Sequence, residues 1–368
     1  MSVTIAFCTA ASVFQGNRIL EENIAKDFPG ALWVTRLAQF AGERGIDVVT
    51  GDIAIARIQE AVLKASEILV IQEENCSLGF ELLQMGAKPF LLFSAESPLY
   101  ARNFYAHLPK ISSIFQHRIL FRGAFASASE GGVNHVMHFP SFSQDFDAVD
   151  VKWASRRFMV MVAANKYWKP QRSTFRHVIA ILRDVIMRRK TYMTHETEEL
   201  QLHDRRLELI EYFGQRNSID LFGTHWENIS NLPAEWRRRL REIVGNLKPT
   251  ACKDKHAVIT NYKFAICFEN ISFPGYVTEK IIDCFRAGVI PIYLGAPDIG
   301  DFVPKASFID LREYTDLDEL NKQLTGITED IASKMINAAR TFLKSEAGDG
   351  YSYEGFARHV LQLVEDYE

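Results

Sequence analysis

Short apolar runs alternate with segments of helical periodicity along the first part of the chain. The helical segments have apolar residues every three to four positions and lie at 31–44, 55–64 and 78–85. The strand-like runs are rich in Val, Ile, Leu and Phe and lie at 3–7, 47–50, 68–72, 89–93 and 133–138. Residues 111–121 add one or two short elements. Strands that alternate with helices of about ten residues predict a mostly parallel sheet covered by helices.

The alternation resumes after a polar stretch at 140–149, which we interpret as a connection between two domains. Strand-like runs follow at 157–163, 218–223, 263–268 and 289–294. Helical segments are predicted at 173–187, 278–287, 316–324, 329–343 and 353–364. A charged helical segment at 192–215 receives no role. Since 368 residues are too many for a typical single domain, we predict domains at 1–150 and 151–344 and a C-terminal helical segment at 345–368.

Composition and charge narrow the class of protein. With 47% hydrophobic and 24% charged residues, the chain has the composition of an ordinary globular protein. Its 42 basic and 46 acidic residues give a net charge of −4, which argues against a generic nucleic-acid-binding protein. No apolar run approaches the ~20 residues of a transmembrane helix, and the first residues lack the pattern of a signal peptide. The five cysteines have no C-x-x-C spacing, so we expect reduced thiols and neither a disulfide framework nor a zinc site.

Candidate chemistry gathers in residues 262–311, which predict a β-α-β unit with a loop before its helix. Glu279 and Lys280 fall in the first turn of that helix. A helix N-terminus attracts phosphate through its unpaired N–H groups, and Lys280 adds a full positive charge. Glu279 offers a carboxylate to sugar hydroxyls, and Asn270 and Tyr276 on the preceding loop offer hydrogen bonds. The stretch therefore indicates an anion site of the kind that holds a nucleotide diphosphate.

The residues alone leave a second interpretation open. The stretch has no G-x-G-x-x-G fingerprint, and the chain has no G-x-x-x-x-G-K-[ST] motif. Glu279 and Lys280 also suit an ordinary capped helix whose first-turn charges are solvated.

Four short motifs add a family resemblance. C-F-E-N, G-Y-V-T-E-K, I-P-I-Y-L-G-A-P and P-K-A-S-F-I-D-L follow one another within residues 262–311. Their order and spacing resemble the C-terminal signature of glycosyltransferase family 10, the α1,3/α1,4-fucosyltransferases. The resemblance implies an α/β fold of GT-B architecture, in which two Rossmann-like domains face each other across a cleft. It also implies that the C-terminal segment packs back toward the first domain.

The resemblance further implies the reaction. We expect inverting transfer of L-fucose from GDP-β-L-fucose to a glycan hydroxyl in an α1,3-type linkage. The acceptor sugar is expected to be N-acetylglucosamine or glucose in a β-galactoside-containing glycan or a bacterial surface polysaccharide. Two alternatives stay open: a transferase that uses another GDP-deoxyhexose, and a nucleotide-sugar-binding protein without turnover.

Single residues receive roles from the same resemblance. Glu96, in the E-S-P element at 96–98, matches the proposed catalytic base, although a helix-start carboxylate explains it as well. Arg172 best matches an arginine that contacts the donor pyrophosphate, and Lys166 is a rival because this loop departs from the family's S-N-x-N pattern. A planar guanidinium suits that contact.

The remaining candidates lie within residues 262–311. Donor binding is assigned to Asn270, Tyr276, Glu279 and Lys280, with Lys263 as a further candidate. Glu269 is a second candidate for the base or a donor contact, and we rank it below Glu96.

Cofactors and location complete the expectations. GT-B enzymes generally have no built-in metal site, so we expect no required cofactor and leave non-essential stimulation by Mn²⁺ or Mg²⁺ open. The expected partners are GDP-fucose and a glycan acceptor, with no nucleic acid and no transmembrane segment. The expected location is cytoplasmic, as in a soluble bacterial-type member, with a peripheral contact at the inner membrane face left open.

Overall fold

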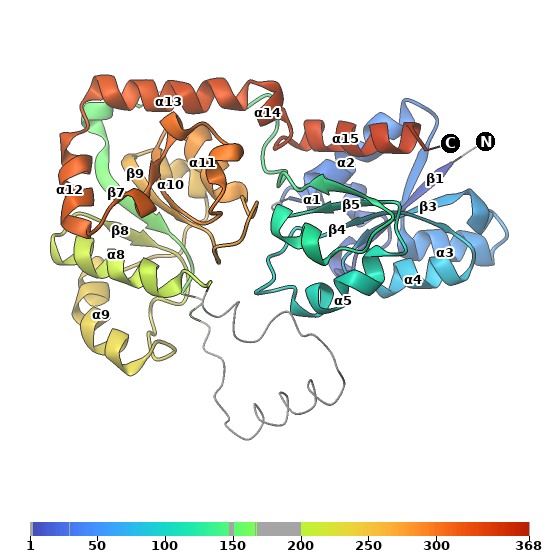
Figure 1. Cartoon of the computed structure of the whole chain (residues 1–368), viewed down its shortest axis with the longest axis horizontal. Helices are drawn as coiled ribbons and strands as arrows, with labels where there is room; N and C mark the ends of the chain where they lie inside the picture. Colours follow the sequence, from blue (N-terminus) through green and yellow to red (C-terminus); the bar gives the residue numbers. More distant parts are fainter. Residues whose placement is uncertain (1–2, 29, 147–150, 166, 168–199, 368) are drawn as a thin grey trace. The chain divides into compact units, whose positions relative to one another are not determined.

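The computed structural model describes the chain except residues 1–2, 29, 147–150, 166, 168–199 and 368 (Figure 1). The described residues form two compact units. Unit 1 comprises 1–146, 273–279 and 344–368, and unit 2 comprises 147–272 and 280–343. The main division therefore falls close to the one expected at residue 150, whereas the short segment 273–279 joins unit 1 although the sequence assigned it to the second domain.

Unit 1 contains a six-stranded sheet in the order β2-β1-β3-β4-β5-β6, and every neighbouring pair is parallel. Its strands are β1 (Thr4–Cys8), β2 (Asp47–Thr50), β3 (Ile68–Glu73), β4 (Lys88–Phe93), β5 (His117–Leu120) and β6 (Val133–Val136). Its helices are α1 (Glu22–Ala25), α2 (Leu32–Gly42), α3 (Gly51–Gln59), α4 (Ser77–Gln84), α5 (Arg102–Ser112), α14 (Glu346–Asp349) and α15 (Tyr353–Glu365). The five strand-like runs predicted in this part of the sequence are confirmed.

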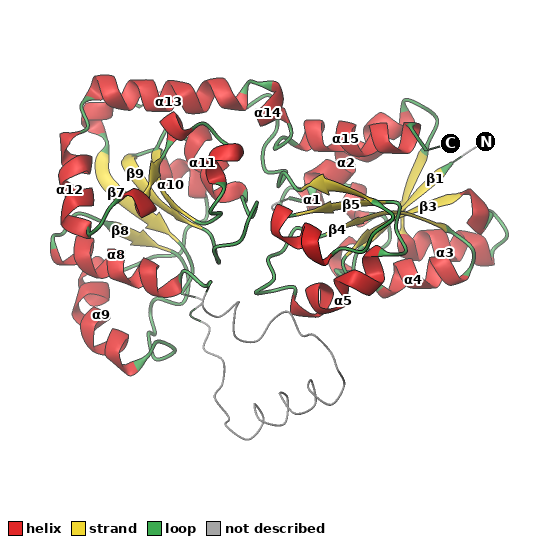
Figure 2. Ribbon diagram, in the orientation of Figure 1, coloured by secondary structure: helices red, strands yellow, loops and turns green. Residues whose placement is uncertain are grey.

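Helices cover both faces of this sheet, α2 and α15 on one and α3, α4 and α5 on the other (Figure 2). Trp33 of α2 packs edge-on against Phe7 of β1, with ring centroids 5.7 Å apart, and against Phe356 of α15 at 4.9 Å. The last helix of the chain therefore belongs to the core of unit 1. Strands buried on both faces read as continuous apolar runs, which is why their positions were visible in the sequence.

Unit 2 repeats this topology with five parallel strands in the order β11-β10-β9-β7-β8. The strands are β7 (Arg157–Val162), β8 (Asp220–Phe222), β9 (Tyr262–Phe268), β10 (Ile290–Leu294) and β11 (Ile309–Asp310). The helices are α8 (His203–Gln215), α9 (Ala234–Leu247), α10 (Lys255–Ile259), α11 (Glu279–Arg286), α12 (Leu317–Gly326) and α13 (Glu329–Leu343). The predicted β-α-β unit is confirmed as β9-α11-β10.

Each sheet has a topological switch point, where successive connections leave toward opposite edges. In unit 1 it lies between β1 and β3, and in unit 2 between β7 and β9. In open α/β sheets, ligands bind outside the carboxyl ends of the strands at such points. The two switch points are therefore where functional residues are sought.

Helices α1, α5, α9 and α10 were not among the predicted helical segments. Helix α5 was not predicted, because Pro109 interrupts its pattern, yet Phe104, Tyr105 and Leu108 give it a buried face. The second half of the charged segment 192–215 forms α8, whose Leu207, Ile210 and Phe213 enter the core of unit 2. The helix predicted at 173–187 lies outside the described residues.

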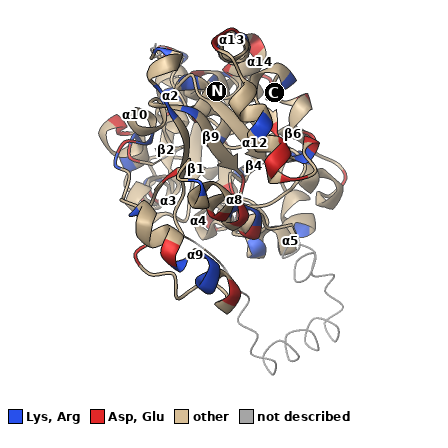
Figure 3. Cartoon of the chain, turned by 90° about the vertical axis from the view of Figure 1, so that its left-hand side faces the viewer, with Lys and Arg blue, Asp and Glu red and all other residues tan. Residues whose placement is uncertain are grey.

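The charge distribution agrees with the balanced composition. In Figure 3, Lys and Arg as well as Asp and Glu are scattered over the surface, and α9 carries both signs. None of the helices in the described part of the chain is long and apolar enough to cross a membrane.

A cluster of histidines in unit 1 predicts a pH-dependent stability. The Nδ1 atom of His117 lies 3.2 Å from Nε2 of His135, and the His135 and His359 rings are 5.2 Å apart. Burial lowers the pKa of all three, and it lowers the pKa of His135 and of nearby His138 to about 4. Because the pKa values in the folded state lie below the usual 6.5, protonation favours the unfolded chain. The contribution of these histidines to the free energy of unfolding is therefore fully present above pH 6.5 and is lost as pH falls toward 4.

We therefore expect the free energy of unfolding of unit 1 to fall between pH 6.5 and 4. The limit is ~3 kcal/mol for a residue with a shift as large as that of His135, less screening by solvent. Urea denaturation across this range, on wild type and His135→Gln, measures it, with His107→Gln on α5 as the control. An equally steep fall in His135→Gln and wild type would contradict the assignment.

Candidate functional site

The unit 2 switch point holds a buried ion pair. Glu269 directly follows β9, and its side chain is 0% exposed. Lys280, in the first turn of α11, places Nζ 3.0 Å from Oε2 of this carboxylate and is itself 22% exposed. Of the predicted residues, the structure thus brings Glu269 and Lys280 into contact. The two side chains pair at the strand end, where the Glu269 carboxylate is buried and Lys280 stays partly exposed.

Arg206, which the sequence did not single out, fastens the same strand end. Its Nη2 donates to the carbonyl oxygens of Phe268 and Glu269, at 2.9 and 2.7 Å, and to Oδ1 of Asn270 at 3.2 Å. The Asn270 carbonyl in turn accepts from the backbone N–H of Leu202, 3.2 Å away. Asn270 is therefore held by α8 and the residue before it. The only sequence signal for this was an arginine one turn into a charged helix with an apolar face.

A glycine makes room for the buried carboxylate. A Cβ on Gly295 would lie 2.4 Å from the Tyr293 hydroxyl and 2.5 Å from Cγ of Glu269. The Tyr293 hydroxyl accepts from the backbone N–H of Ala296 at 3.0 Å, and the Glu269 N–H donates to the Leu294 carbonyl at 2.9 Å. The L-G-A segment after β10 thus packs directly against the ion pair.

The segment 273–279 places Tyr276 inside unit 1. Its ring is 2% exposed and packs edge-on against Phe121, with centroids 4.8 Å apart. The neighbouring Pro274 carbonyl accepts from Gly123 N–H at 2.8 Å. Glu279 is the first residue of α11, as predicted. Tyr276 is therefore a packed aromatic side chain, and its expected role in donor binding stays a prediction.

The unit 1 switch point gathers three glutamates. Thr9, after β1, donates through its hydroxyl to Oε2 of Glu73 at 2.5 Å. Glu74 accepts from the Ser94 hydroxyl at 2.8 Å. Glu96 lies on the same loop as Ser94, after β4, and its side chain is exposed. The predicted base thus lies at the carboxyl edge of the sheet, beside two half-buried carboxylates, Glu73 and Glu74, that no sequence motif marks.

Burial sets the protonation of this group. It raises the pKa of Glu73, and it raises the pKa of Glu74 to about 7, against a weaker opposing effect of the Ser94 hydrogen bond. The charges of Glu73 and Glu96 raise the pKa of Glu74 further. Burial also raises the pKa of Tyr105, whose hydroxyl donates to the Glu96 carbonyl at 3.0 Å. One carboxyl near Glu96 therefore changes protonation close to neutral pH, which is the range useful for acid-base chemistry.

Other predicted residues lie apart from these groups. Lys263 is near the start of β9, the end opposite Glu269, with Nζ 5.1 Å from the centre of the Trp153 ring. Lys166 and Arg172 lie outside the described residues. The structure therefore gives Lys263 a cation–π contact away from the switch point.

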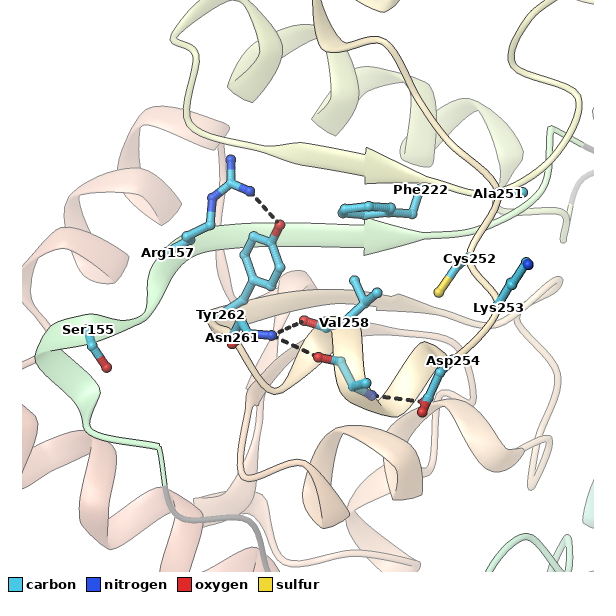
Figure 4. A pocket seen from close by; sticks show the side chains of 11 residues that line it. Ser155, Arg157, Phe222, Ala251, Cys252, Lys253, Asp254, Val258, Asn261 and Tyr262 are labelled. Atoms are coloured by element: carbon cyan, nitrogen blue, oxygen red, sulfur yellow. Dashed lines mark hydrogen bonds between the residues drawn. The ribbon is translucent and has the colours of Figure 1, made fainter.

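Among the cavities in the described part of unit 2, two lie near β7. The larger, about 730 Å³, reaches the beginnings of β7 and β9 at Arg157 and Tyr262, whose side chains hydrogen-bond at 3.1 Å (Figure 4). The smaller lies at the carboxyl end of β7 and includes Asn165, His203 and Arg206. His203 is 5% exposed, Nε2 has no hydrogen-bond partner among the described residues, and burial lowers its pKa to about 4. The smaller cavity thus adds a neutral imidazole beside the switch point.

No group of three or more His, Cys, Asp or Glu side chains within the described ranges is arranged to hold a metal ion.

Comparison with known proteins connects this geometry to a family. The model of glycosyltransferase family 10 (fucosyltransferase), C-terminal part, matches residues 186–335. An alpha-(1,3)-fucosyltransferase of Helicobacter pylori is 47% identical over 68 residues, 18% of this chain and 14% of the relative. An alpha-(1,4)-fucosyltransferase of Arabidopsis thaliana is 36% identical over 75 residues, 20% and 19% of the two chains. The human GDP-fucose protein O-fucosyltransferase 3 is 32% identical over 96 residues, 25% and 20%. The matched segments thus span between about a seventh and a fifth of these relatives.

Solved structures agree on the fold. An alpha1,3-fucosyltransferase crystal structure aligns with a TM-score of 0.51 and 15% identity, over 100% of this chain and 91% of that one. Anabaena HepE in complex with UDP and glucose aligns with a TM-score of 0.59 and 10% identity, over 99% and 100%. At these identities the likeness is one of fold. The predicted GT-B class, with two Rossmann-like domains, is confirmed.

Proposed function

We propose that this chain, a member of glycosyltransferase family 10 through residues 186–335, transfers L-fucose from GDP-fucose to a glycan hydroxyl with inversion. The observation that carries the proposal is that the matched region contains the β9-α11-β10 unit with its Glu269–Lys280 pair at the switch point. The names of the relatives supply the sugar and, for the human protein, the GDP-linked donor. The name of the Helicobacter relative favours an α1,3 linkage.

Donor recognition follows from the electrostatics of this unit. The start of α11 presents helix N–H groups, and Lys280 adds positive charge beside them, so the diphosphate of the donor is attracted there. The same groups stabilise the negative charge that GDP gains as the C1–O bond breaks. Asn270, Tyr276, Glu279 and, outside the described residues, Arg172 stay candidates for further donor contacts.

Glu96 is the proposed base. Its exposed carboxylate takes the proton of the acceptor hydroxyl while that oxygen attacks C1 of fucose and GDP leaves. Attack from the face opposite the leaving group inverts the anomeric configuration. The acceptor proposed is N-acetylglucosamine or glucose in a β-galactoside-containing glycan or a bacterial surface polysaccharide.

A donor and acceptor screen tests the function. The purified chain is incubated with GDP-fucose, GDP-mannose, GDP-rhamnose or UDP-glucose and with N-acetyllactosamine, lactose or a peptide acceptor, and products are identified by mass. We expect a deoxyhexose adduct of a glycan with GDP-fucose. Transfer of another GDP-deoxyhexose would change the donor assignment, and donor binding without transfer or hydrolysis would indicate a binding protein.

Metal independence is a further prediction. The diphosphate charge is assigned to α11 and Lys280, so most of the transfer activity should survive excess EDTA. Initial rates with EDTA, Mn²⁺ and Mg²⁺ measure this. Faster transfer with Mn²⁺ or Mg²⁺ is compatible with the prediction as long as activity does not depend on these ions, because free ions bind released GDP. Complete loss with EDTA that only a divalent cation reverses would contradict the prediction.

A further inference from the structure

We infer that Glu74 is a positioning residue for Glu96, acting through the Ser94 hydroxyl on the backbone of the loop that carries the proposed base. The inference rests on the proposed function for its catalytic meaning, while the hydrogen-bonded arrangement can be tested separately. It gives a task to a carboxylate that the transfer mechanism does not otherwise use.

Contacts join the two glutamates through one serine. Oε1 of Glu74 accepts from Oγ of Ser94 at 2.8 Å. The same Oγ lies 3.3 Å from both the backbone N and the carbonyl O of Glu96. Tyr105 of α5 also donates to that carbonyl, at 3.0 Å. The Glu96 backbone is thus held by two hydroxyls, one of which is bound by Glu74.

The backbone at Glu74 is unusual for its residue type. Its φ is +50°, in the left-handed region that non-glycine residues rarely adopt. Two hydrogen bonds fix it there, from Glu74 N–H to the Phe93 carbonyl at 3.0 Å and from Nε2 of Gln72 to the Glu74 carbonyl at 2.8 Å. Such conformations persist only where the surroundings enforce them, and they gather at functional sites. Here the conformation sets Glu74 directly after β3 with its carboxylate on Ser94.

The single proton of Ser94 makes the arrangement sensitive to the charge of Glu74. When Glu74 is ionised, Ser94 donates to it at 2.8 Å and keeps a lone pair for the Glu96 N–H. When Glu74 is protonated, its own O–H can donate to Ser94, whose proton then turns to the Glu96 carbonyl. Each state satisfies every group, but only the first makes Ser94 a charge-assisted donor and therefore a stronger acceptor for Glu96 N–H.

The charges around Glu74 place this change near neutrality. Glu73 on β3 and Glu96 on the loop after β4 oppose its ionisation, and Tyr105 on α5 is a neutral phenol beside it. Since burial raises the pKa of Glu74 to about 7, the ionised arrangement prevails above neutral pH and the protonated one below. The loop that carries Glu96 is then ordered most strongly at mildly alkaline pH.

Amide hydrogen exchange tests the arrangement without requiring activity. Protection of the Glu96 N–H, corrected for intrinsic exchange, is measured at pH 6 and pH 8 in the full chain and in Glu74→Gln, Ser94→Ala and Glu81→Gln. Glu74→Gln can still accept from Ser94 but cannot ionise, and Glu81→Gln is the matched control on the exposed side of α4. Protection in wild type and Glu81→Gln should be about 2- to 10-fold larger at pH 8, the range for one hydrogen bond. It should be independent of pH in Glu74→Gln and absent in Ser94→Ala.

Kinetics add the catalytic readout. In Glu74→Gln, kcat should fall by about 2- to 10-fold with KM for the donor unchanged, and the step near pH 7 in the kcat profile should disappear. Wild-type protection and an unchanged pH profile in both Glu74→Gln and Ser94→Ala would overturn the inference. Should Glu74→Gln fail to fold, Ser94→Ala decides alone. If wild type shows the exchange pattern but transfers no fucose, the proposed function fails and the hydrogen-bonded arrangement stands.

Discussion

Lys280→Ala is expected to lower the free energy of unfolding by roughly 3 kcal/mol, because it removes the ammonium that neutralises a fully buried carboxylate. The side chain of Glu269 is 0% exposed, and its Cγ is packed against the backbone of Gly295. Water therefore cannot replace Lys280 without rearrangement. The low end of the range for broken buried pairs applies because Lys280 itself is 22% exposed.

The same substitution is expected to weaken GDP binding, and a double variant separates the two effects. Glu269→Gln with Lys280→Met leaves no uncompensated charge, so its stability should return toward wild type. Its affinity for GDP should stay reduced by ~1.5–3 kcal/mol, the contribution of a charge-assisted hydrogen bond, which corresponds to about 10- to 150-fold. Chemical denaturation and calorimetry on wild type, Lys280→Ala and the double variant measure both quantities.

Lys263→Ala provides the matched control, since this lysine lies on β9 at the end opposite Glu269. Its substitution should leave GDP affinity unchanged and remove only the contact with the Trp153 ring. Wild-type GDP affinity in the double variant would show that Lys280 serves stability alone. A loss in Lys263→Ala would move the donor to the other end of the sheet, where the larger cavity lies.

The sequence predicted those parts of the fold whose signal is local. Buried parallel strands are continuous apolar runs, so β1, β3 and β9 could be located without knowledge of their neighbours. The start of α11 was visible because Glu279 and Lys280 are charged residues at the beginning of a segment with helical periodicity. The family resemblance then identified the fold class.

Residues whose role depends on strand order were not predictable in this way. Glu73 and Glu74 are two acidic residues after a strand, and only the position of β3 beside β1 puts them at a switch point. In the sequence, Arg206 is one of several charged residues in a helical segment. Only the structure shows its contacts with the end of β9, about sixty residues later. The pattern of charged residues along a helix does not indicate which backbone carbonyl an arginine side chain will contact.

The same limit applies to the segment 273–279. Its sequence is continuous with α11, and the aromatic residue Tyr276 suited a loop that binds a donor. Phe121, against which Tyr276 packs, lies 155 residues earlier in the chain, and the contact is an edge-on packing of two aromatic rings. Periodicity and motif spacing carry no information about such a contact.

Glu96→Gln should lower turnover by about 10²–10⁴-fold, because the amide keeps the shape of the side chain but cannot take the acceptor proton. GDP affinity should stay within twofold. Stability should stay close to wild type, since the hydrogen bonds from Ser94 and Tyr105 are made to the Glu96 backbone and the side chain is exposed. If Glu96 only began a helix, Glu96→Gln would instead lower the free energy of unfolding by a few tenths of a kcal/mol and leave turnover almost unchanged.

Glu269→Gln, assayed in parallel, decides between the two candidate bases. The structure favours Glu96, because a side chain 0% exposed and paired with Lys280 at 3.0 Å is poorly placed to reach an acceptor hydroxyl. Loss of turnover in Glu96→Gln alone, with normal GDP affinity in both variants, would support that assignment. Loss in Glu269→Gln alone, in a protein of unchanged stability, would assign the base to unit 2. Near-normal turnover in both would leave the inverting mechanism without a base among these residues and would require its rejection.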